Sequence, residues 1–280
     1  MKLSDIKQIL SERGIKLTKS LGQNFLHDQN QLRRIADAAR LNKTDKVLEI
    51  GPGLGPLTEL LVEHANEVLA IEKDRNLIEV LEERVKTPTL QLIHDDALVF
   101  LEREKRDWTG WKAVSNLPYS VASLILVELA LAEHGPKMIV ATLQLEVAKR
   151  LMASPGDKDY GVLTLLVQVE YEPKGFFKIP ASCFYPEPDV DSACVSLARW
   201  VPSLVKAEEK PVFTKIVKRA FSQRRKMMLK LLKEDWPEKG LQRIFEQLRL
   251  PFQIRAESVA LEQFVSLARE LSNPSEHGRE

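Results

Sequence analysis

The sequence predicts an α/β fold in which a mostly parallel sheet is followed by a small all-helical domain. Two observations carry this prediction. Short apolar runs alternate with amphipathic helical patterns through the first two thirds of the 280 residues, which is typical of a parallel sheet covered by helices. Beyond residue 206 the pattern is helical only. The length is compatible with one large domain or two smaller ones.

The expected elements follow one another in β-α order. Strands are predicted at residues 47–50, 68–71, 90–93, 113–115 and 138–143, and helices at residues 57–64, 74–86 and 121–132. Two later β-rich segments, 162–169 and 193–198, are expected to form an antiparallel edge of the same sheet.

The predicted domains are residues 1–205 and 206–280. The segment 201–211 contains Pro202 and Pro211 and is expected to be a linker. Four helices are predicted after it, at residues 212–221, 224–232, 241–248 and 257–271.

Composition excludes several classes of protein. The chain is 44% hydrophobic and 29% charged, and no apolar run is long enough to span a membrane. The first 19 residues are charged and have no apolar signal core, so a cytoplasmic location is expected. The two cysteines, Cys183 and Cys194, suggest neither a disulfide framework nor a metal cluster. Nothing demands more than a monomer.

Charge is distributed unevenly behind a formal net charge of +1. Residues 1–34 hold 7 Lys and Arg against 3 Asp and Glu, and residues 206–280 hold 16 against 11. Within residues 213–233 there are eight cations and no acid. A solvated helix face is one interpretation, but uncompensated cations repel one another, which favours contact with a polyanion such as nucleic acid. The candidate RNA-binding residues are Lys215, Lys218, Arg219, Arg224, Arg225 and Lys226.

A glycine turn follows the first predicted strand. Gly51, Gly53 and Gly55 lie between that strand and a helix, where glycines let a backbone bend tightly and approach a ligand. Glu72 ends the second strand and is suited to accept both hydroxyls of a ribose. A dinucleotide site needs G-x-G-x-x-G, whereas the sixth position here is Pro56. This spacing favours S-adenosylmethionine over NAD or FAD, with a turn that binds no ligand as the remaining alternative.

Two aspartates follow the third strand. Asp96 is placed to reach an adenine amino group, and it is equally suited to cap the next helix. Spacing alone does not separate Asp96 from Asp95.

A second motif, Asn116-Leu-Pro-Tyr119, follows the fourth strand and is expected in the same crevice. An exocyclic amino group of a base is a poor nucleophile because its lone pair is delocalised into the ring. Two acceptors, the side-chain oxygen of Asn116 and the carbonyl of Leu117, would hold its N–H bonds and direct the lone pair at a methyl group. Pro118 would stiffen the loop, and Tyr119 would stack on a flipped base. A structural turn with a packed tyrosine is the alternative.

Together these motifs resemble those of adenine-N6 RNA methyltransferases. Three further segments narrow the resemblance to the ribosomal small-subunit RNA adenine dimethyltransferases of the bacterial KsgA/RsmA type. They are the N-terminal motif LGQNFLHD at residues 21–28, the motif FYPEPDVDS at residues 184–192, and FSQRRK at residues 221–226. The resemblance extends from about residue 17 to residue 271 and implies a Rossmann-like class I methyltransferase domain.

The resemblance also implies roles for matched positions. Asn24 and Leu26 would close over the methionine end of the cofactor, and Tyr119 and Phe184 would sandwich the flipped adenine. Asp191 and Ser192 are expected to brace the loop that carries Phe184. The implied cofactor-binding residues are Asn24, Leu26, Gly51, Gly53, Glu72, Asp96 and Asn116. The implied catalytic residues are Asn116, Leu117, Pro118, Tyr119 and Phe184.

The implied reaction is dimethylation of two adjacent adenosines in the 3′-terminal hairpin loop of 16S ribosomal RNA, linked to small-subunit biogenesis. The basic helices and the N-terminal arm would contact phosphates. Alternatives are a large-subunit RNA methyltransferase of the resistance type, a non-catalytic assembly or transcription factor, and a DNA adenine methyltransferase. The last usually has an acidic residue where this chain has Asn116.

Overall fold

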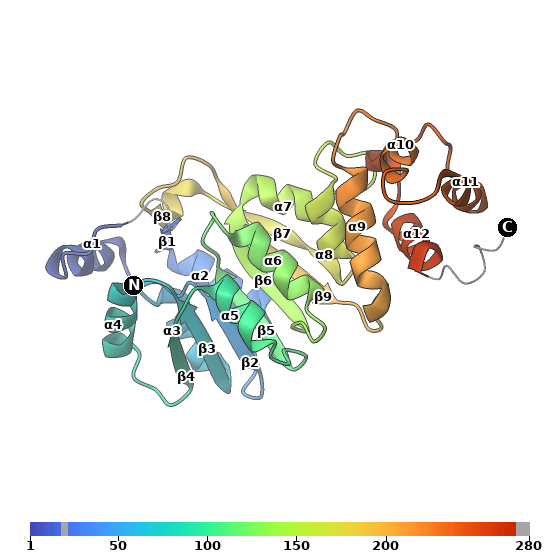
Figure 1. Ribbon diagram of the computed structural model, residues 1–280. Coiled ribbons are helices and arrows are strands. Elements are labelled where there is room, and N and C mark those ends of the chain that lie inside the picture. Colours follow the sequence, from blue (N-terminus) through green and yellow to red (C-terminus); the bar gives the residue numbers. More distant parts are fainter. Residues whose placement is uncertain (18–21, 273–280) are drawn as a thin grey trace. The chain divides into compact units, whose positions relative to one another are not determined.

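The computed structural model describes residues 1–17 and 22–272, so Leu21 of the N-terminal motif lies outside the described residues. Contacts divide the chain into two compact units, residues 1–148 with 173–199, and residues 149–172 with 200–280. Each unit is described separately below, and the ribbon is drawn in Figure 1.

A seven-stranded sheet forms the centre of the first unit, in the order β4-β3-β2-β5-β6-β9-β7. The first five strands are parallel and β9 is antiparallel to β6, which confirms the predicted mostly parallel sheet and the antiparallel segment at 193–198. The strands are β2 (Lys46–Ile50), β3 (Glu67–Glu72), β4 (Leu90–His94), β5 (Trp111–Asn116), β6 (Met138–Gln144), β7 (Tyr171–Ile179) and β9 (Ser192–Arg199). A separate antiparallel pair joins β1 (Phe25–Leu26) to β8 (Phe184–Tyr185).

Helices cover both faces of this sheet. One core cluster packs α2 (Gln29–Ala38) and α3 (Pro56–His64) against Val47, Val68 and Val140 of three strands. The helices α5 (Ala97–Glu104) and α6 (Ala122–Leu131) pack side by side in front of the strands in Figure 1. The remaining helices of this part are α1 (Leu3–Glu12), α4 (Arg75–Arg84) and α7 (Leu145–Met152), whose last residues belong to the second unit.

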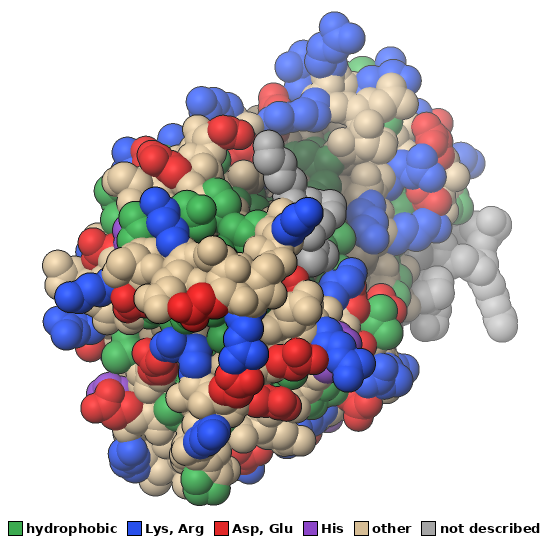
Figure 2. Space-filling model, turned by 90° about the vertical axis from the view of Figure 1, so that its left-hand side faces the viewer, with side chains coloured by type: hydrophobic (Ala, Val, Ile, Leu, Met, Phe, Trp, Pro, Cys, Tyr) green, Lys and Arg blue, Asp and Glu red, His purple; other side chains and the backbone are tan. Residues whose placement is uncertain are grey.

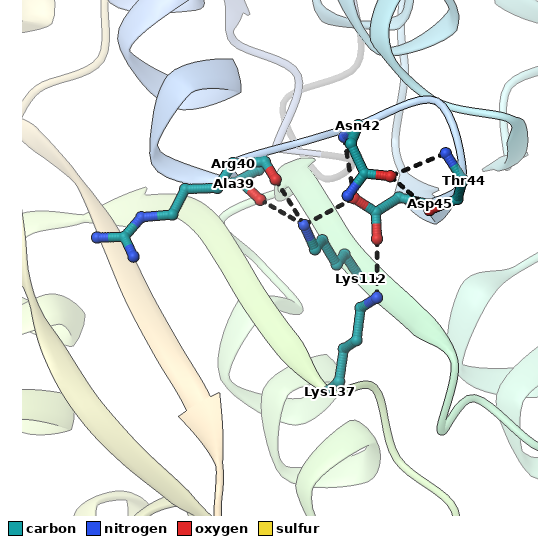
Figure 3. Close-up of polar contacts among 7 residues, drawn as sticks. All are labelled: Ala39, Arg40, Asn42, Thr44, Asp45, Lys112 and Lys137. Atoms are coloured by element: carbon teal, nitrogen blue, oxygen red, sulfur yellow. Dashed lines mark hydrogen bonds and ion pairs between the residues drawn. The ribbon is translucent and has the colours of Figure 1, made fainter.

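A buried ion cluster lies at the amino ends of strands β2, β5 and β6 (Figure 3). Asp45, which is 2% exposed, accepts hydrogen bonds from Lys112 Nζ at 2.8 Å and Lys137 Nζ at 2.7 Å. Lys112 Nζ also donates to the carbonyl oxygens of Ala39 and Arg40, the two residues that follow α2, at 3.0 and 2.7 Å. Burial alone would raise the pKa of Asp45, but the two lysine hydrogen bonds outweigh it and hold the pKa below its usual range. One carboxylate therefore connects α2 to strands β5 and β6.

The second unit is helical. Its helices are α8 (Val162–Gln168), α9 (Lys210–Ala220), α10 (Met228–Leu232), α11 (Glu238–Gln247) and α12 (Leu261–Ser272). The aromatic rings of Tyr160, Phe221 and Phe264 pack against one another in this unit, and the Tyr160 hydroxyl donates to the carbonyl of Val259 at 2.8 Å. The helical character predicted beyond residue 206 is confirmed, whereas the domain boundary at residue 205 stays a prediction.

The prediction of a strand at 162–169 is wrong, because this segment is the helix α8. The amide of Gly161 donates to Thr164 Oγ1 at 3.1 Å, and Thr164 Oγ1 donates to the carbonyl of Arg150 at 2.6 Å. These hydrogen bonds satisfy the first turn of a helix that is buried along most of its length. A short apolar run does not distinguish a buried strand from a buried helix.

Candidate functional site

The glycine turn and the Asn116–Tyr119 loop lie against each other at the carboxyl ends of β2 and β5. Gly51 adopts a φ of +70°, and a Cβ at this position would lie 3.1 Å from the ring of Pro118. Gly53 adopts a φ of +58°, and a Cβ there would lie 2.8 Å from the ring of Phe25. Glycine is required at both positions because the backbone is left-handed and another group fills the space of a side chain.

Glu72 ends β3 and faces this turn. It is 7% exposed, and its carboxylate accepts hydrogen bonds from the backbone amides of Gly53 at 3.1 Å and of Lys73 and Asp74 at 2.9 Å. Burial raises the pKa of Glu72, while these three amides stabilise the charged form. The carboxylate is thus held rigidly, with lone pairs left over for two hydroxyl donors.

Asp96 and Asp95 have different partners. Asp96 Oδ1 accepts from the amide of Leu98 at 2.9 Å as the cap of α5, and its Oδ2 accepts from Lys73 Nζ at 2.7 Å. The Lys73 hydrogen bond is the main reason that the pKa of Asp96 is lowered. Asp95 instead pairs with Arg103 at 2.8 Å. Both aspartates line the pocket, and an adenine amino group would share Asp96 with the exposed Lys73 side chain.

Asn116 is oriented by one hydrogen bond and keeps one atom free. Its Nδ2 donates to the backbone carbonyl of Asn24 at 3.0 Å. Its Oδ1 is buried and has no hydrogen-bond partner among the described residues. The next amide, that of Leu117, donates to the carbonyl of Thr142 at 3.0 Å, while its own carbonyl accepts no hydrogen bond from the described part of the chain. Two acceptors without a donor among the described residues therefore belong to consecutive residues at the end of β5.

The N-terminal motif forms one wall of the site. Leu26 is 1% exposed and pairs with Phe184 across β1 and β8, and Asn24 lies just before β1. Because Asn24 holds the Asn116 side chain, this motif and the loop after β5 form one unit.

Tyr119 and Phe184 meet edge to face. Their ring centroids are 6.4 Å apart at an interplanar angle of 68°, and Phe184 is 2% exposed. The Tyr119 hydroxyl shares a 2.5 Å hydrogen bond with Ser192 Oγ, and burial raises its pKa to about 12. In this arrangement the rings leave no slot for a base, so the predicted sandwich requires one ring to turn. Among the described residues, neither ring lines the pocket.

Asp191 braces the loop before Ser192, as expected. Its carboxylate accepts from the amide of Ala181 at 3.0 Å and pairs with Lys178 at 2.6 Å.

One pocket collects most of the predicted residues. It is lined by Asn24, Leu26, Gly51, Gly53, Glu72, Asp95, Asp96, Asn116, Leu117 and Pro118, together with apolar side chains. The pocket thus holds a buried carboxylate, a second carboxylate at a helix cap and a buried amide oxygen without a partner among the described residues. These are the groups that the sequence predicts around S-adenosylmethionine and a target amine. The described residues contain no cluster of His, Cys, Asp and Glu side chains suited to a metal ion.

Sequence reasoning missed Glu49, which also lines this pocket. It is 1% exposed, and its Oε2 has no partner among the residues that the structure describes. Burial raises the pKa of Glu49 to about 8, the nearby Thr58 hydroxyl offsets part of this rise, and the charge of Glu72 adds to it. The sequence signal was present, since Glu49 immediately precedes Ile50 and the glycine turn.

The basic residues of the second unit fall into two groups. Lys215 and Arg219 pair with Asp235, at 2.9 and 2.5 Å. Arg224 also lies 3.8 Å from Glu257, and Lys233 pairs with Glu238. The interpretation that the cations lack compensating acids is therefore wrong for these four side chains. Arg224 donates to the carbonyl of Lys158 at 2.9 Å. The described part of the chain supplies no acidic partner for the exposed side chains of Lys218, Arg225 and Lys226.

No helix in the described ranges combines the length and the apolar character needed to cross a membrane.

Comparisons with known proteins agree with one another. A family model described as ribosomal RNA adenine dimethylase matches residues 14–273. A ribosomal RNA small subunit methyltransferase A from Pelotomaculum thermopropionicum is 40% identical, with 94% of each chain covered. One of the same name from a Geobacillus species is 35% identical over 95% of this chain and 96% of its own.

Two solved structures are similar over almost their whole length. A dimethyladenosine transferase from Plasmodium falciparum has a TM-score of 0.76 and 25% identity, covering 89% of this chain and 98% of its own. The 23S rRNA methyltransferase ErmE has a TM-score of 0.67 and 26% identity, covering 88% of this chain and 99% of its own.

Proposed function

Because the chain belongs to the ribosomal RNA adenine dimethylase family, we propose that it dimethylates two adjacent adenosines in the 3′-terminal hairpin loop of 16S ribosomal RNA. The methyl donor is S-adenosylmethionine, and the product is N6,N6-dimethyladenosine. The enzyme acts on the small subunit during its assembly, as a monomer in the cytoplasm.

The small subunit is favoured over the large one by the relatives. The two curated relatives named above are small-subunit methyltransferases that are 35% and 40% identical to this chain over nearly all of its length. ErmE, whose name gives 23S RNA as its substrate, is 26% identical.

The observation that carries the proposed chemistry is the free, buried Oδ1 of Asn116. A buried acceptor without a donor is unfavourable unless a ligand supplies one. The two N–H bonds of an adenine amino group would donate to this oxygen and to the carbonyl of Leu117. The nitrogen lone pair is then turned out of the ring system and toward the bound cofactor. The monomethylated amine keeps one N–H, which would donate to one of the two acceptors during the second transfer.

The remaining pocket residues hold the cofactor, which supplies an electrophilic methyl group on a sulfonium. Glu72 would accept the two ribose hydroxyls, and Asp96 the adenine amino group. Gly51 and Gly53 would present their backbone to the methionine end, which Asn24 and Leu26 close off. The three backbone amides on Glu72 support this role because they orient the carboxylate before any ligand arrives.

Proton transfer needs no strong base in this scheme. Burial raises the pKa of Tyr119 to about 12, so its hydroxyl keeps its proton at neutral pH. The amino proton becomes acidic once the new C–N bond has formed, and it then leaves to solvent. Tyr119 and Phe184 would contact the flipped adenine after one of the rings turns.

The second unit would bind RNA phosphates. Lys218, Arg225 and Lys226 carry most of this role in our proposal because they are exposed and free of acidic partners among the described residues. Lys215, Arg219 and Arg224 would contribute less, since each already has a partner within the unit.

The decisive experiment is methyl transfer from labelled S-adenosylmethionine to unmethylated small ribosomal subunits, with large subunits and DNA in parallel. We expect dimethyladenosine in small-subunit RNA only, identified by mass. Asn116→Ala should lose at least a thousandfold in turnover and retain subunit binding, whereas the exposed Asn66→Ala should match wild type. Label in large subunits would favour the resistance type. Wild-type turnover in Asn116→Ala would contradict the two-acceptor chemistry.

A further inference from the structure

The helix α1 packs in one apolar cluster with residues that line the pocket. It is amphipathic, with Ile6 and Leu10 at 0% and 8% exposure on its inner face. These two side chains form one apolar cluster with Phe25, Leu54, Leu77 and Val80. The helix precedes the residues that match the family model, which begin at residue 14.

Members of this cluster are also walls of the pocket. Phe25 and Leu77 line it directly, and Leu54 stands in the glycine turn between Gly53 and Gly55. The apolar cluster that contains Ile6 and Leu10 of α1 therefore also contributes side chains to the pocket wall.

A continuous line of contacts leads from α1 to the proposed ribose acceptor. The ring of Phe25 fills the space beside Gly53, where a Cβ would lie 2.8 Å from the ring. The amide of Gly53 in turn donates to Glu72 Oε2 at 3.1 Å. Movement of the Phe25 ring would take a packing partner from Gly53, whose amide is one of the three that orient Glu72.

Polar contacts fasten α1 to its surroundings at both ends. Gln29 Nε2 of α2 donates to the carbonyl of Met1 at 2.9 Å, and Arg13 pairs with Glu83 of α4. Lys7 Nζ lies 5.3 Å from the ring centroid of Tyr185 in β8. Figure 2 views the molecule from the side where α1 and α4 lie in Figure 1, and acidic and basic side chains are mixed there. The apolar inner face of α1 is the feature that links this helix to the pocket lining.

We propose that α1 is a positioning element for the cofactor site: Ile6 and Leu10 hold Phe25 against Gly53 and thereby set the position of Glu72. The inference rests on the proposed function, since it concerns how the same pocket binds the adenosyl group of S-adenosylmethionine. A well-packed support fixes a binding group because cores have few alternative arrangements.

The test combines the double variant Ile6→Ala/Leu10→Ala with the milder Ile6→Val, in case the double variant fails to fold. Leu129→Ala is the matched control, because Leu129 is 2% exposed in α6 of the same unit and lies outside the pocket lining. Titration calorimetry with S-adenosylmethionine and with S-adenosylhomocysteine, well below each melting temperature, gives Kd. Hydrogen exchange of residues 51–55 in the free protein gives a readout that needs no ligand.

We expect the double variant to weaken binding of both ligands at least tenfold and to speed exchange of the Gly53 amide. Ile6→Val should change both in the same direction, by about twofold to threefold. Leu129→Ala should lower the melting temperature while Kd stays within twofold of wild type. Unchanged Kd and exchange in both α1 variants would overturn the inference, as would an equal loss of affinity in Leu129→Ala. A wild-type protein that methylates no small-subunit RNA would instead refute the proposed function, and the exchange readout would still judge α1.

Discussion

The buried carboxyl of Glu49 makes stability depend on pH in a way that one substitution should abolish. In the native protein its pKa is raised to about 8, chiefly by burial, from a usual value of 4.5. The native state therefore keeps a proton that the unfolded chain has already lost between these two pH values. Stability must fall as pH rises through this window, because the unfolded state binds fewer protons than the native state. Glu49→Gln is neutral at every pH and removes this contribution.

The magnitude follows from the two pKa values. Each pKa unit corresponds to about 1.4 kcal/mol, so the Glu49 contribution to the free energy of unfolding should fall by roughly 3–4 kcal/mol between pH 5 and pH 8. Wild type should lose this amount relative to Glu49→Gln over the same range. The free energy of unfolding of Glu49→Gln minus that of wild type should therefore be higher at pH 8 than at pH 5 by roughly 3–4 kcal/mol.

Urea unfolding at pH 5, 6, 7 and 8 measures the difference directly, with the exposed Glu63→Gln as the control. Only the difference between variants is used, so the titration of all other groups cancels. Parallel pH profiles for wild type and Glu49→Gln would refute the reasoning, because they would mean that Glu49 ionises equally in both states.

Three further predictions concern other parts of the molecule. Glu72→Ala should weaken binding of S-adenosylmethionine at least a hundredfold by calorimetry, and unchanged affinity would exclude Glu72 as the ribose acceptor. Lys112→Met should lower the free energy of unfolding by about 3–5 kcal/mol in urea, because it removes a buried partner of Asp45; a loss below 1 kcal/mol would show that Lys137 alone suffices. Charge reversal of Arg225 and Lys226 should reduce the salt dependence of small-subunit binding by about two ion equivalents, and an unaltered slope would remove both from the phosphate contacts.

The fold was predictable where a periodic pattern agreed with its surroundings. Strands β2, β3 and β6 are short apolar runs between turn signals, and the structure has all three. The segment 162–168 was not predictable in this way, because a short apolar run is equally typical of a buried strand and the hydrogen bond from Thr164 to Arg150 is not visible in the sequence. The helix α1 was also missed. Ile6 and Leu10 lie among charged residues, and the sequence alone does not show that they pack into an apolar cluster.

The site was predictable to the extent that it consists of local motifs. Glycines, Glu72 and Asn116 carry their chemistry in the sequence, and the pocket brings them together. Which atom of Asn116 is free depends on the carbonyl of Asn24, 92 residues away, and no local pattern contains that information. The pairing of Lys215 and Arg219 was missed for a simpler reason. Their partner Asp235 lies two residues beyond the basic segment that ends at residue 233.

Because of the path of the chain, a single cut in the sequence cannot separate the two units. Residues 149–172 belong to the second unit although they precede strand β9 of the first, so the chain passes from one unit to the other more than once. Glu170, fully buried, pairs with Lys210 at 2.8 Å and accepts from Ser203 at 3.0 Å. Cutting the gene once, near codon 205, would separate Glu170 from Lys210 and α8 from α9, which packs against it. Recombination that exchanges the second unit among relatives must therefore replace two separate stretches of sequence together, and a single crossover would yield a hybrid with a mismatched core.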